Sequence, residues 1–269
     1  MAAVKTGARY LIEVHGDFWN PNPRYAASFW RQWLAATLLV KADGIRVVSH
    51  RVSHHLLCAI SGVRLSHIFK LPVPVTIPSS APVTAQRAPD RVQALFVGRL
   101  SPEKGLEEFL GVFARVAHEV PGLFLTIVGD GPERMRLEAC ARALGLTDRV
   151  SFVGWVRDPS VSFQEADFLV LPSYHESWGR VVIEALGAGL PVLMTDVGCA
   201  GEVVQHEKNG LVVPVGDVET MALALKRMAV DGDLRRQLGA QARSSIEGLP
   251  TREQAVQLYR QFWLGSQDT

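Results

Sequence analysis

Short apolar runs alternate with stretches of helical periodicity over the last two thirds of the chain. The runs are apolar throughout, which is typical of strands buried on both faces of a parallel sheet. They lie at residues 92–97, 123–128, 150–153, 167–171, 190–195 and 211–213. Apolar positions three or four residues apart predict helices at residues 104–120, 133–144, 179–188, 218–230 and 233–247, with a short helix near Glu202. This alternation predicts a doubly wound α/β domain over residues 91–250.

The segment before this domain carries a weaker pattern. Residues 10–14 and 45–48 resemble strands, and residues 25–40 form an aromatic-rich helical stretch. A self-sufficient sheet has about five to six strands, so residues 1–75 are predicted to form a partial α/β domain.

Two further segments complete the predicted organisation. Residues 76–90 belong to a proline-rich stretch and are predicted to be a linker, because proline interrupts helices and removes ladder donors. Residues 251–269 are predicted to contain a helix that packs back on the N-terminal domain. Its apolar face carries Tyr259, Phe262 and neighbouring residues at helical spacing.

Composition narrows the function classes. The chain has 269 residues, of which 48% are hydrophobic and 20% charged, with a net charge of +1. Such a balance gives no general attraction to nucleic acid, so an anion site must be local. The three scattered cysteines do not make a disulfide framework or a zinc motif. The first ten residues lack the apolar core of a signal peptide and no run of about 18 apolar residues occurs, so we expect a cytoplasmic protein.

Ligands bind beyond the carboxyl ends of strands in open parallel sheets, so the loops there matter most. The first loop reads GRLSPEKG and places Gly98, Arg99 and Lys104 just before a helix. Two cations beside a helix N-terminus suit a diphosphate. The alternative is that both are solvated surface cations.

The second turn, GDGP, lacks the third glycine of the dinucleotide fingerprint because position 134 is Arg. A nicotinamide or flavin enzyme is therefore not indicated. The turn is interpreted as a tight connection with Pro132 at the first helical position.

The loop and helix LPSYHESWGRVVIEALGAG carry two acids eight residues apart. Glu184 lies in a stretch that is apolar on nearly every side, where an ionised carboxylate needs hydrogen-bond donors. Two ribose hydroxyls would supply them, and a structural role with backbone amides is the alternative. Glu176 precedes the predicted helix start, where the amides of Ser177, Trp178 and Gly179 could hold a phosphate or a sugar hydroxyl.

Histidines offer weaker signals. His15 directly follows the first predicted strand and could contact a reacting sugar, although a lone histidine is more often structural. His50, His54 and His55 lie close together without an obvious third ligand at metal-binding spacing, so no metal site is predicted.

The aromatic residues Phe29, Trp30 and Trp33 could touch a membrane surface. The preferred interpretation is a helix that packs on its own domain.

Together, GRLSPEKG, IVGDGP, FVGWV and the Glu176–Glu184 pair, in this order, resemble family 4 of the retaining glycosyltransferases, the glycosyl transferases group 1. The likeness covers residues 90–250. It implies a GT-B-like architecture: a complete C-terminal Rossmann-like domain that binds the nucleotide sugar, and a partial N-terminal Rossmann-like domain on the acceptor side.

The resemblance also implies an activity. A hexose-type sugar would move from a nucleoside diphosphate sugar to an acceptor hydroxyl with retention, on a sugar, lipid-linked or small-molecule acceptor. It implies no cofactor and no obligatory metal, with cations of the protein in the metal's place. An Asp-x-Asp occurs at Asp231 and Asp233, but between two helices, and is interpreted as helix capping.

The resemblance assigns roles to the acids and cations. Arg99 and Lys104 would bind the donor diphosphate and stabilise the departing charge. Glu184 would hold the ribose, and Glu176 with the neighbouring amides would hold the donor sugar.

The remaining implied roles are less tied to side-chain chemistry. The backbone at Trp155 and Val156 would face the base, Glu202 would help to close the sugar pocket, and His15 would contact the sugar on the acceptor side.

Two departures from the family pattern leave alternatives open. The usual glycine pair before Glu202 is replaced by Gly198, Cys199, Ala200 and Gly201. The early N-terminal strands and glycine-rich loop of the family have no counterpart before Tyr10, so the N-terminal domain is expected to be truncated. A non-catalytic or truncated donor-binding module, or a nucleotide-sugar epimerase on the same scaffold, are the alternatives.

Overall fold

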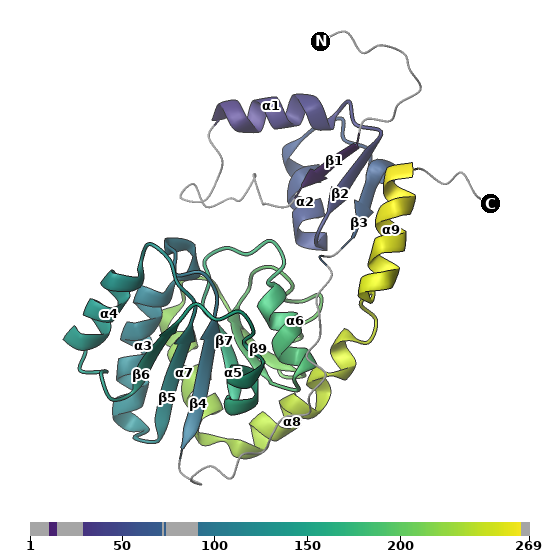
Figure 1. Cartoon of the computed structure of the whole chain (residues 1–269). Helices are drawn as coiled ribbons and strands as arrows, with labels where there is room; N and C mark the ends of the chain where they lie inside the picture. The colour runs from purple at the N-terminus through teal and green to yellow at the C-terminus, as the bar shows by residue number, and fades with distance from the viewer. Residues whose placement is uncertain (1–10, 15–28, 72, 74–90, 265–269) are drawn as a thin grey trace. The chain divides into compact units, whose positions relative to one another are not determined.

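The structure is a computed structural model and describes residues 11–14, 29–71, 73 and 91–264 (Figure 1). These residues fall into two compact units. The first comprises the described residues of Met1–Pro74 and Leu249–Thr269, together with Glu176–Trp178. The second comprises those of Val75–His175 and Gly179–Gly248.

The second unit is built on a six-stranded parallel sheet. Its strands are β4 (Val92–Val97), β5 (Leu123–Val128), β6 (Val150–Gly154), β7 (Phe168–Leu171), β8 (Val192–Thr195) and β9 (Gly210–Val213). They lie in the order β6-β5-β4-β7-β8-β9, so the direction of winding reverses between β4 and β7. Such a reversal is the point at which doubly wound sheets open a crevice for ligands.

Helices cover both faces of this sheet, as Figure 1 shows. They are η2 (Pro102–Lys104), α3 (Leu106–Glu119), α4 (Arg134–Ala143), α5 (Ser160–Glu165), α6 (Arg180–Gly187), α7 (Val218–Val230), α8 (Gly232–Ala242) and η3 (Ser244–Ile246). Helix α3 contacts α4 and α7, whereas α6 contacts α8 and η3. The strands β4, β7 and β8 are buried almost throughout, because both of their faces are covered.

The first unit contains a three-stranded parallel sheet in the order β1-β2-β3. Its elements are β1 (Leu11–Val14), α1 (Phe29–Leu39), β2 (Gly44–Val47), α2 (His50–Ala59), η1 (Leu65–His67), β3 (Ile68–Lys70) and α9 (Arg252–Leu264). No helix in the described part of the chain combines the length and apolar character needed to cross a bilayer.

A fully buried arginine lies in the central strand of this small sheet. The guanidinium of Arg46 forms an ion pair with Glu13 at 3.2 Å and donates to the carbonyl of Leu71 at 2.9 Å. Because a buried charge is costly unless it is paired and hydrogen-bonded, these contacts are needed to keep Arg46 inside.

Helix α9 packs on the same sheet. The Arg46 guanidinium carbon lies 4.5 Å from the centre of the Tyr259 ring, and burial raises the pKa of the Tyr259 phenol. Phe262 is 3% exposed and meets Phe69 of β3 with ring centroids 5.4 Å apart. Helix α9 therefore completes the core of the first unit.

The predicted parallel α/β architecture is confirmed, and two of the predicted helices are corrected. The helix expected over residues 104–120 is interrupted at Gly105, whose φ of +66° is left-handed, so Lys104 ends a separate 3-10 turn. The short helix expected near Glu202 is wrong: the chain there forms turns, with a bridge between Ala200 and Val204. The predicted linker, residues 76–90, lies outside the described residues.

Candidate functional site

Two loops flank the reversal of the second unit's sheet. Residues 98–105 follow β4, and residues 172–175 follow β7. The backbone N–H of Tyr174 donates to the carbonyl of Glu103 at 2.8 Å. A Cβ on Gly105 would lie 2.3 Å from the carbonyl oxygen of Pro172. The two loops are therefore in direct contact, and only glycine fits at position 105.

The GDGP turn packs on the first of these loops. The N–H of Leu100 donates to the carbonyl of Asp130 at 2.9 Å. A Cβ on Gly129 would lie 1.9 Å from the oxygen of Gly98, and one on Gly131 would lie 2.2 Å from that of Leu100. Glycine is needed at both positions because two backbone segments approach each other there. This contact accounts for the two glycines, and no bound dinucleotide is needed to explain them.

The helix after this turn begins later than the sequence suggests. Helix α4 starts at Arg134 with Glu133 as its N-cap residue. The prediction that Pro132 occupies the first helical position is therefore wrong.

The loop after β4 presents cations beside one carboxylate. Arg99 is exposed and Lys104 is half-buried. The hydroxyl of Ser101 donates to Glu103 at 2.5 Å. Burial raises the pKa of Glu103, but this hydrogen bond and the charges of Lys104 and Arg99 more than offset it and lower the pKa below its ordinary value. Glu103 is thus ionised at neutral pH, and positive charge is in excess on the loop.

Glu184 lies one turn into α6, the helix that follows β7. Its side chain is 21% exposed, and its carboxylate lies 3.7 Å from the guanidinium of Arg180, which is too long for a hydrogen bond. Burial raises the pKa of Glu184, and Arg180 offsets part of that rise. The carboxylate is therefore poorly solvated and suited to accept hydrogen bonds from a ligand.

The residues just before α6 belong to the first unit. Glu176 and Ser177 are half-buried, whereas Trp178 is 3% exposed. The indole nitrogen of Trp178 has no hydrogen-bond partner among the described residues. Helix α6 begins at Arg180 after Gly179, whose φ of +84° is left-handed, so the amides of Ser177 and Trp178 precede the helix.

The loop after β6 joins the same row of loops. The N–H of Gly129 donates to the carbonyl of Gly154 at 2.8 Å. The next residue, Trp155, is 72% exposed, and Val156 is half-buried. The loops after β4, β5 and β6 are therefore joined through backbone contacts.

Glu202 lies in a different hollow. Its pocket, of about 590 Å³ with open solvent included, lies between the β8–β9 connection and the end of α8. Gln205, Lys208 and Ser245 contribute polar groups to it. The loop of Arg99 and Lys104 does not line this pocket.

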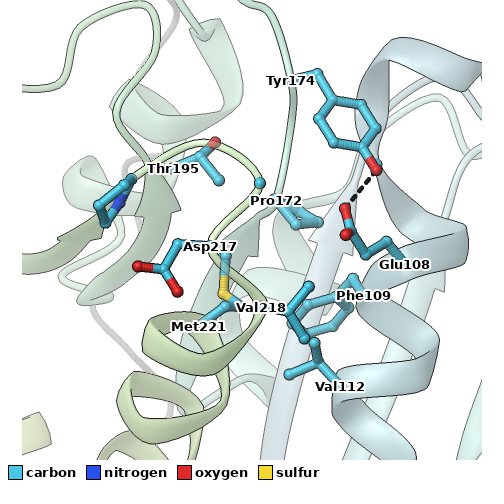
Figure 2. Close-up of a pocket in the computed structure, with 12 residues that line it drawn as sticks. Glu108, Phe109, Val112, Pro172, Tyr174, Thr195, Asp217, Val218 and Met221 are labelled. Carbon is cyan, nitrogen blue, oxygen red and sulfur yellow. Dashed lines mark hydrogen bonds between the residues drawn. The ribbon is translucent and has the colours of Figure 1, made fainter.

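Another pocket lies where α3 and α7 begin (Figure 2). It encloses about 300 Å³, open solvent included, and Gly105 and Tyr174 of the two joined loops form part of its wall. The hydroxyl of Tyr174 donates to the carboxylate of Glu108 on α3 at 2.5 Å. Sequence reasoning missed both residues, because 66 positions separate them and no local pattern connects them.

The histidines and the Asp-x-Asp sequence singled out above differ in what the structure shows of them. His15 lies outside the described residues. His50 contacts the ammonium of Lys70 at 2.9 Å, and within the described ranges no group of three or more His, Cys, Asp or Glu could hold a metal ion. Asp231 accepts from the N–H of Leu234 at 2.8 Å as the N-cap of α8, which confirms its predicted capping role.

Comparison with known proteins agrees with this arrangement. The family model "Glycosyl transferases group 1" matches residues 83–245, which include all six strands of the large sheet. The chain belongs to this family. Among curated relatives, lipopolysaccharide core biosynthesis glycosyltransferase LpsE of Rhizobium meliloti is 32% identical over 173 residues, covering 64% of this chain and 50% of LpsE.

A second relative, the 2-deoxystreptamine N-acetyl-D-glucosaminyltransferase of Streptomyces fradiae, is 31% identical over 205 residues, covering 70% of this chain and 49% of the relative. The chain thus spans about half the length of these two curated relatives.

Solved structures show the same fold. Sucrose-phosphate synthase from Thermosynechococcus elongatus superposes with a TM-score of 0.81 at 28% identity, covering 96% of this chain and 69% of the synthase. TarM of S. aureus reaches a TM-score of 0.82 at 18% identity, covering 96% of this chain and 51% of TarM. HepE of Anabaena, in complex with UDP and glucose, reaches 0.76 at 22% identity, covering 93% of this chain and 69% of HepE. The fold is therefore that of the GT-B glycosyltransferases.

Proposed function

We propose that this chain binds a nucleoside diphosphate sugar and takes part in transferring its hexose-type sugar to an acceptor hydroxyl, with retention of configuration. The observation that carries the proposal is the pair of joined loops at the reversal of the sheet. One loop bears Arg99 and Lys104, and the other leads into the helix that holds Glu184. Membership of the glycosyl transferases group 1 supports this assignment.

Arg99 and Lys104 act on the leaving group. During transfer, the bond between the anomeric carbon and the diphosphate oxygen breaks, the acceptor oxygen bonds to that carbon, and the acceptor proton is released. The nucleoside diphosphate gains negative charge as it departs. Two cations placed in advance beside that charge stabilise the transition state more than the ground state.

Glu184 holds the ribose. Two neighbouring hydroxyls are donors that match the two oxygens of a carboxylate. Because burial raises the pKa of Glu184, hydrogen bonds to its ionised form would lower that pKa again. Nucleotide binding and ionisation of Glu184 therefore favour each other.

The other roles rest on the family resemblance and stay predictions. Glu176 with the amides of Ser177, Trp178 and Gly179 would hold the donor sugar. The backbone at Trp155 would face the base.

His15 would contact the sugar from the acceptor side. For Glu202 we expect no more than a contribution to closing the sugar pocket, since its own hollow is lined by residues of the β8–β9 connection and α8.

The donor site is tested by thermal unfolding with UDP, GDP and ADP. A ligand at about 100 times its Kd stabilises the folded protein by about 2.7 kcal/mol, so one of the three should raise the melting temperature clearly. Glu184→Ala should abolish the shift. Glu165→Ala, which alters an exposed carboxylate on α5, should retain it. Absence of any shift in the wild-type chain with all three nucleotides would refute the donor site.

Transfer is tested separately with the nucleotide sugar whose base gives the shift. Release of nucleoside diphosphate that depends on an added acceptor identifies a transferase, and the anomeric configuration of the product decides retention. Isomerisation of the sugar without an acceptor would identify an epimerase instead. Binding without either reaction would identify a donor-binding module.

A further inference from the structure

We propose that Tyr174 is a positioning residue that holds the loop of Arg99 and Lys104 in the shape that receives the diphosphate. The inference rests on the donor site proposed above and adds a residue that neither the motifs nor the family resemblance assigns to it.

Tyr174 contacts the chain on both sides of Gly105. Its backbone N–H donates to the carbonyl of Glu103 at 2.8 Å, in the 3-10 turn before Gly105. Its phenolic hydroxyl donates to Glu108 at 2.5 Å, in the first turn of α3 after Gly105. Figure 2 shows the tyrosine ring extending towards α3 with this hydrogen bond at its tip. One residue therefore connects the two segments that Gly105 separates.

Gly105 is the point at which the loop could change shape. Its φ of +66° is left-handed, and glycine adopts such a conformation and its alternatives with little steric cost. Lys104 directly precedes it. Without a contact that spans Gly105, the turn carrying Lys104 could rotate relative to α3. The Tyr174–Glu108 hydrogen bond restricts that rotation.

A pocket lies beside the hydrogen bond between Tyr174 and Glu108. The pocket between α3 and α7 is lined by Gly105, Glu108 and Tyr174, so one side of this hydrogen bond faces open space, whereas the backbone of Pro172 packs against Gly105 itself. The loop that carries Tyr174 is itself held in place, because the hydroxyl of Thr195 donates to the carbonyl of Ser173 at 2.5 Å. The hydrogen bond to Glu108 therefore supplies restraint on the side where packing does not.

The consequence is specific to the phosphates of the ligand. A loop that is already ordered loses less conformational entropy when it binds the diphosphate. Removing the hydroxyl should weaken binding of a diphosphate more than binding of a nucleotide with fewer phosphates. A residue with a purely structural role would weaken both equally or lower the melting temperature alone.

The experiment is a calorimetric titration of Tyr174→Phe with whichever of UDP, GDP and ADP binds the wild-type chain, and with the corresponding monophosphate. We expect the Kd of the diphosphate to rise about three- to tenfold, and that of the monophosphate to change much less. Glu108→Ala should have the same effect. The double variant should be no weaker than either single variant, because both remove one interaction.

Two controls accompany these variants. Glu108→Gln keeps an oxygen that accepts from Tyr174 and should restore most of the affinity. Glu107→Ala changes the neighbouring exposed carboxylate, which pairs with Arg136 at 2.7 Å, and should leave both Kd values unchanged.

The inference is overturned if Tyr174→Phe binds the diphosphate like wild type, if both nucleotides weaken equally, or if the losses in the two single variants add. Glu108→Ala decides the matter should Tyr174→Phe fail to fold. Failure of the wild-type chain to bind any of the three diphosphates would instead refute the donor site, and this inference with it.

Discussion

The carboxylate of Glu184 shows how burial acts on a single charged side chain. Four fifths of the side chain is withdrawn from solvent, and the nearby guanidinium of Arg180 is itself more than half exposed. Desolvation therefore dominates over attraction and raises the pKa. A carboxylate in this state costs stability until a ligand supplies donors, as expected where binding and stability compete.

A first prediction concerns the pH dependence of stability at this residue. Because its pKa is higher in the folded than in the unfolded chain, Glu184 costs stability as the pH rises through the folded value, and the cost is absent below about pH 4. Glu184→Gln should therefore have a higher melting temperature than wild type near neutral pH. This difference should disappear on acidification. Thermal scans across this range measure it.

Glu207 provides a control of opposite sign. The hydrogen bond from Arg227 lowers the pKa of Glu207, so Glu207→Gln should lose stability near neutral pH and recover it in acid. Equal differences at every pH for Glu184→Gln would contradict the burial of its charge.

At the scale of elements, the loops after β4, β5 and β7 act as one structure. Backbone hydrogen bonds join residues 98–105 to the GDGP turn on one side and to Tyr174 on the other. Glycines stand where these backbones approach most closely. A change in one loop should therefore be transmitted to the cations of another.

Gly131→Ala tests this transmission. The added Cβ would lie 2.2 Å from the carbonyl oxygen of Leu100, so the backbone next to Arg99 must move. We expect a loss of about 1–3 kcal/mol in stability from overpacking. The Kd of the nucleoside diphosphate should rise on the order of tenfold, which corresponds to about 1.4 kcal/mol.

Gly111→Ala is the matched substitution in open space. Apart from its chain neighbours and the backbone of its own helix, no described atom lies within 4 Å of the added Cβ, and Gly111 is in the interior of α3. Alanine should stabilise the helix by about 0.5–1 kcal/mol and leave nucleotide affinity unchanged. Unaltered binding by Gly131→Ala would show that the loops are not coupled.

At the scale of the whole molecule, the chain returns to its first unit at the end. Helix α9 lies against the sheet formed by β1, β2 and β3. Gly44 leaves room for this helix, since a Cβ there would lie 3.2 Å from the ring of Phe262. The first unit therefore depends on residues from both ends of the described chain.

Phe262→Ala tests that dependence. Removing a buried phenylalanine costs about 3–5 kcal/mol, and the loss should fall on the first unit alone. Hydrogen exchange should show lower protection in β1, β2 and β3 and unchanged protection in β4 to β9. Leu264→Ala, at a position that is 74% exposed, should leave both sets of strands protected. Loss of protection in both units would show that they unfold together.

Strong local patterns were sufficient to predict much of the second unit. The strands Val92–Val97 and Leu123–Val128 and the helix Val218–Val230 have the bounds that apolar spacing indicates. Short elements such as β3 and α5 were not predicted, because each has too few residues to display a hydrophobic period. The helix expected near Glu202 failed because left-handed glycines at 198 and 201 turn the chain there.

The amino-acid sequence by itself determined the parallel α/β architecture and the family, because fully apolar strands, glycine turns and paired acids are local patterns. Which residues meet was decided only by the tertiary structure. The order of the strands brings the loops after β4 and β7 together, although about seventy positions separate Glu103 from Tyr174. Contacts such as Tyr174 with Glu108 and Arg46 with Tyr259 follow from that packing, and no spacing along the chain encodes them.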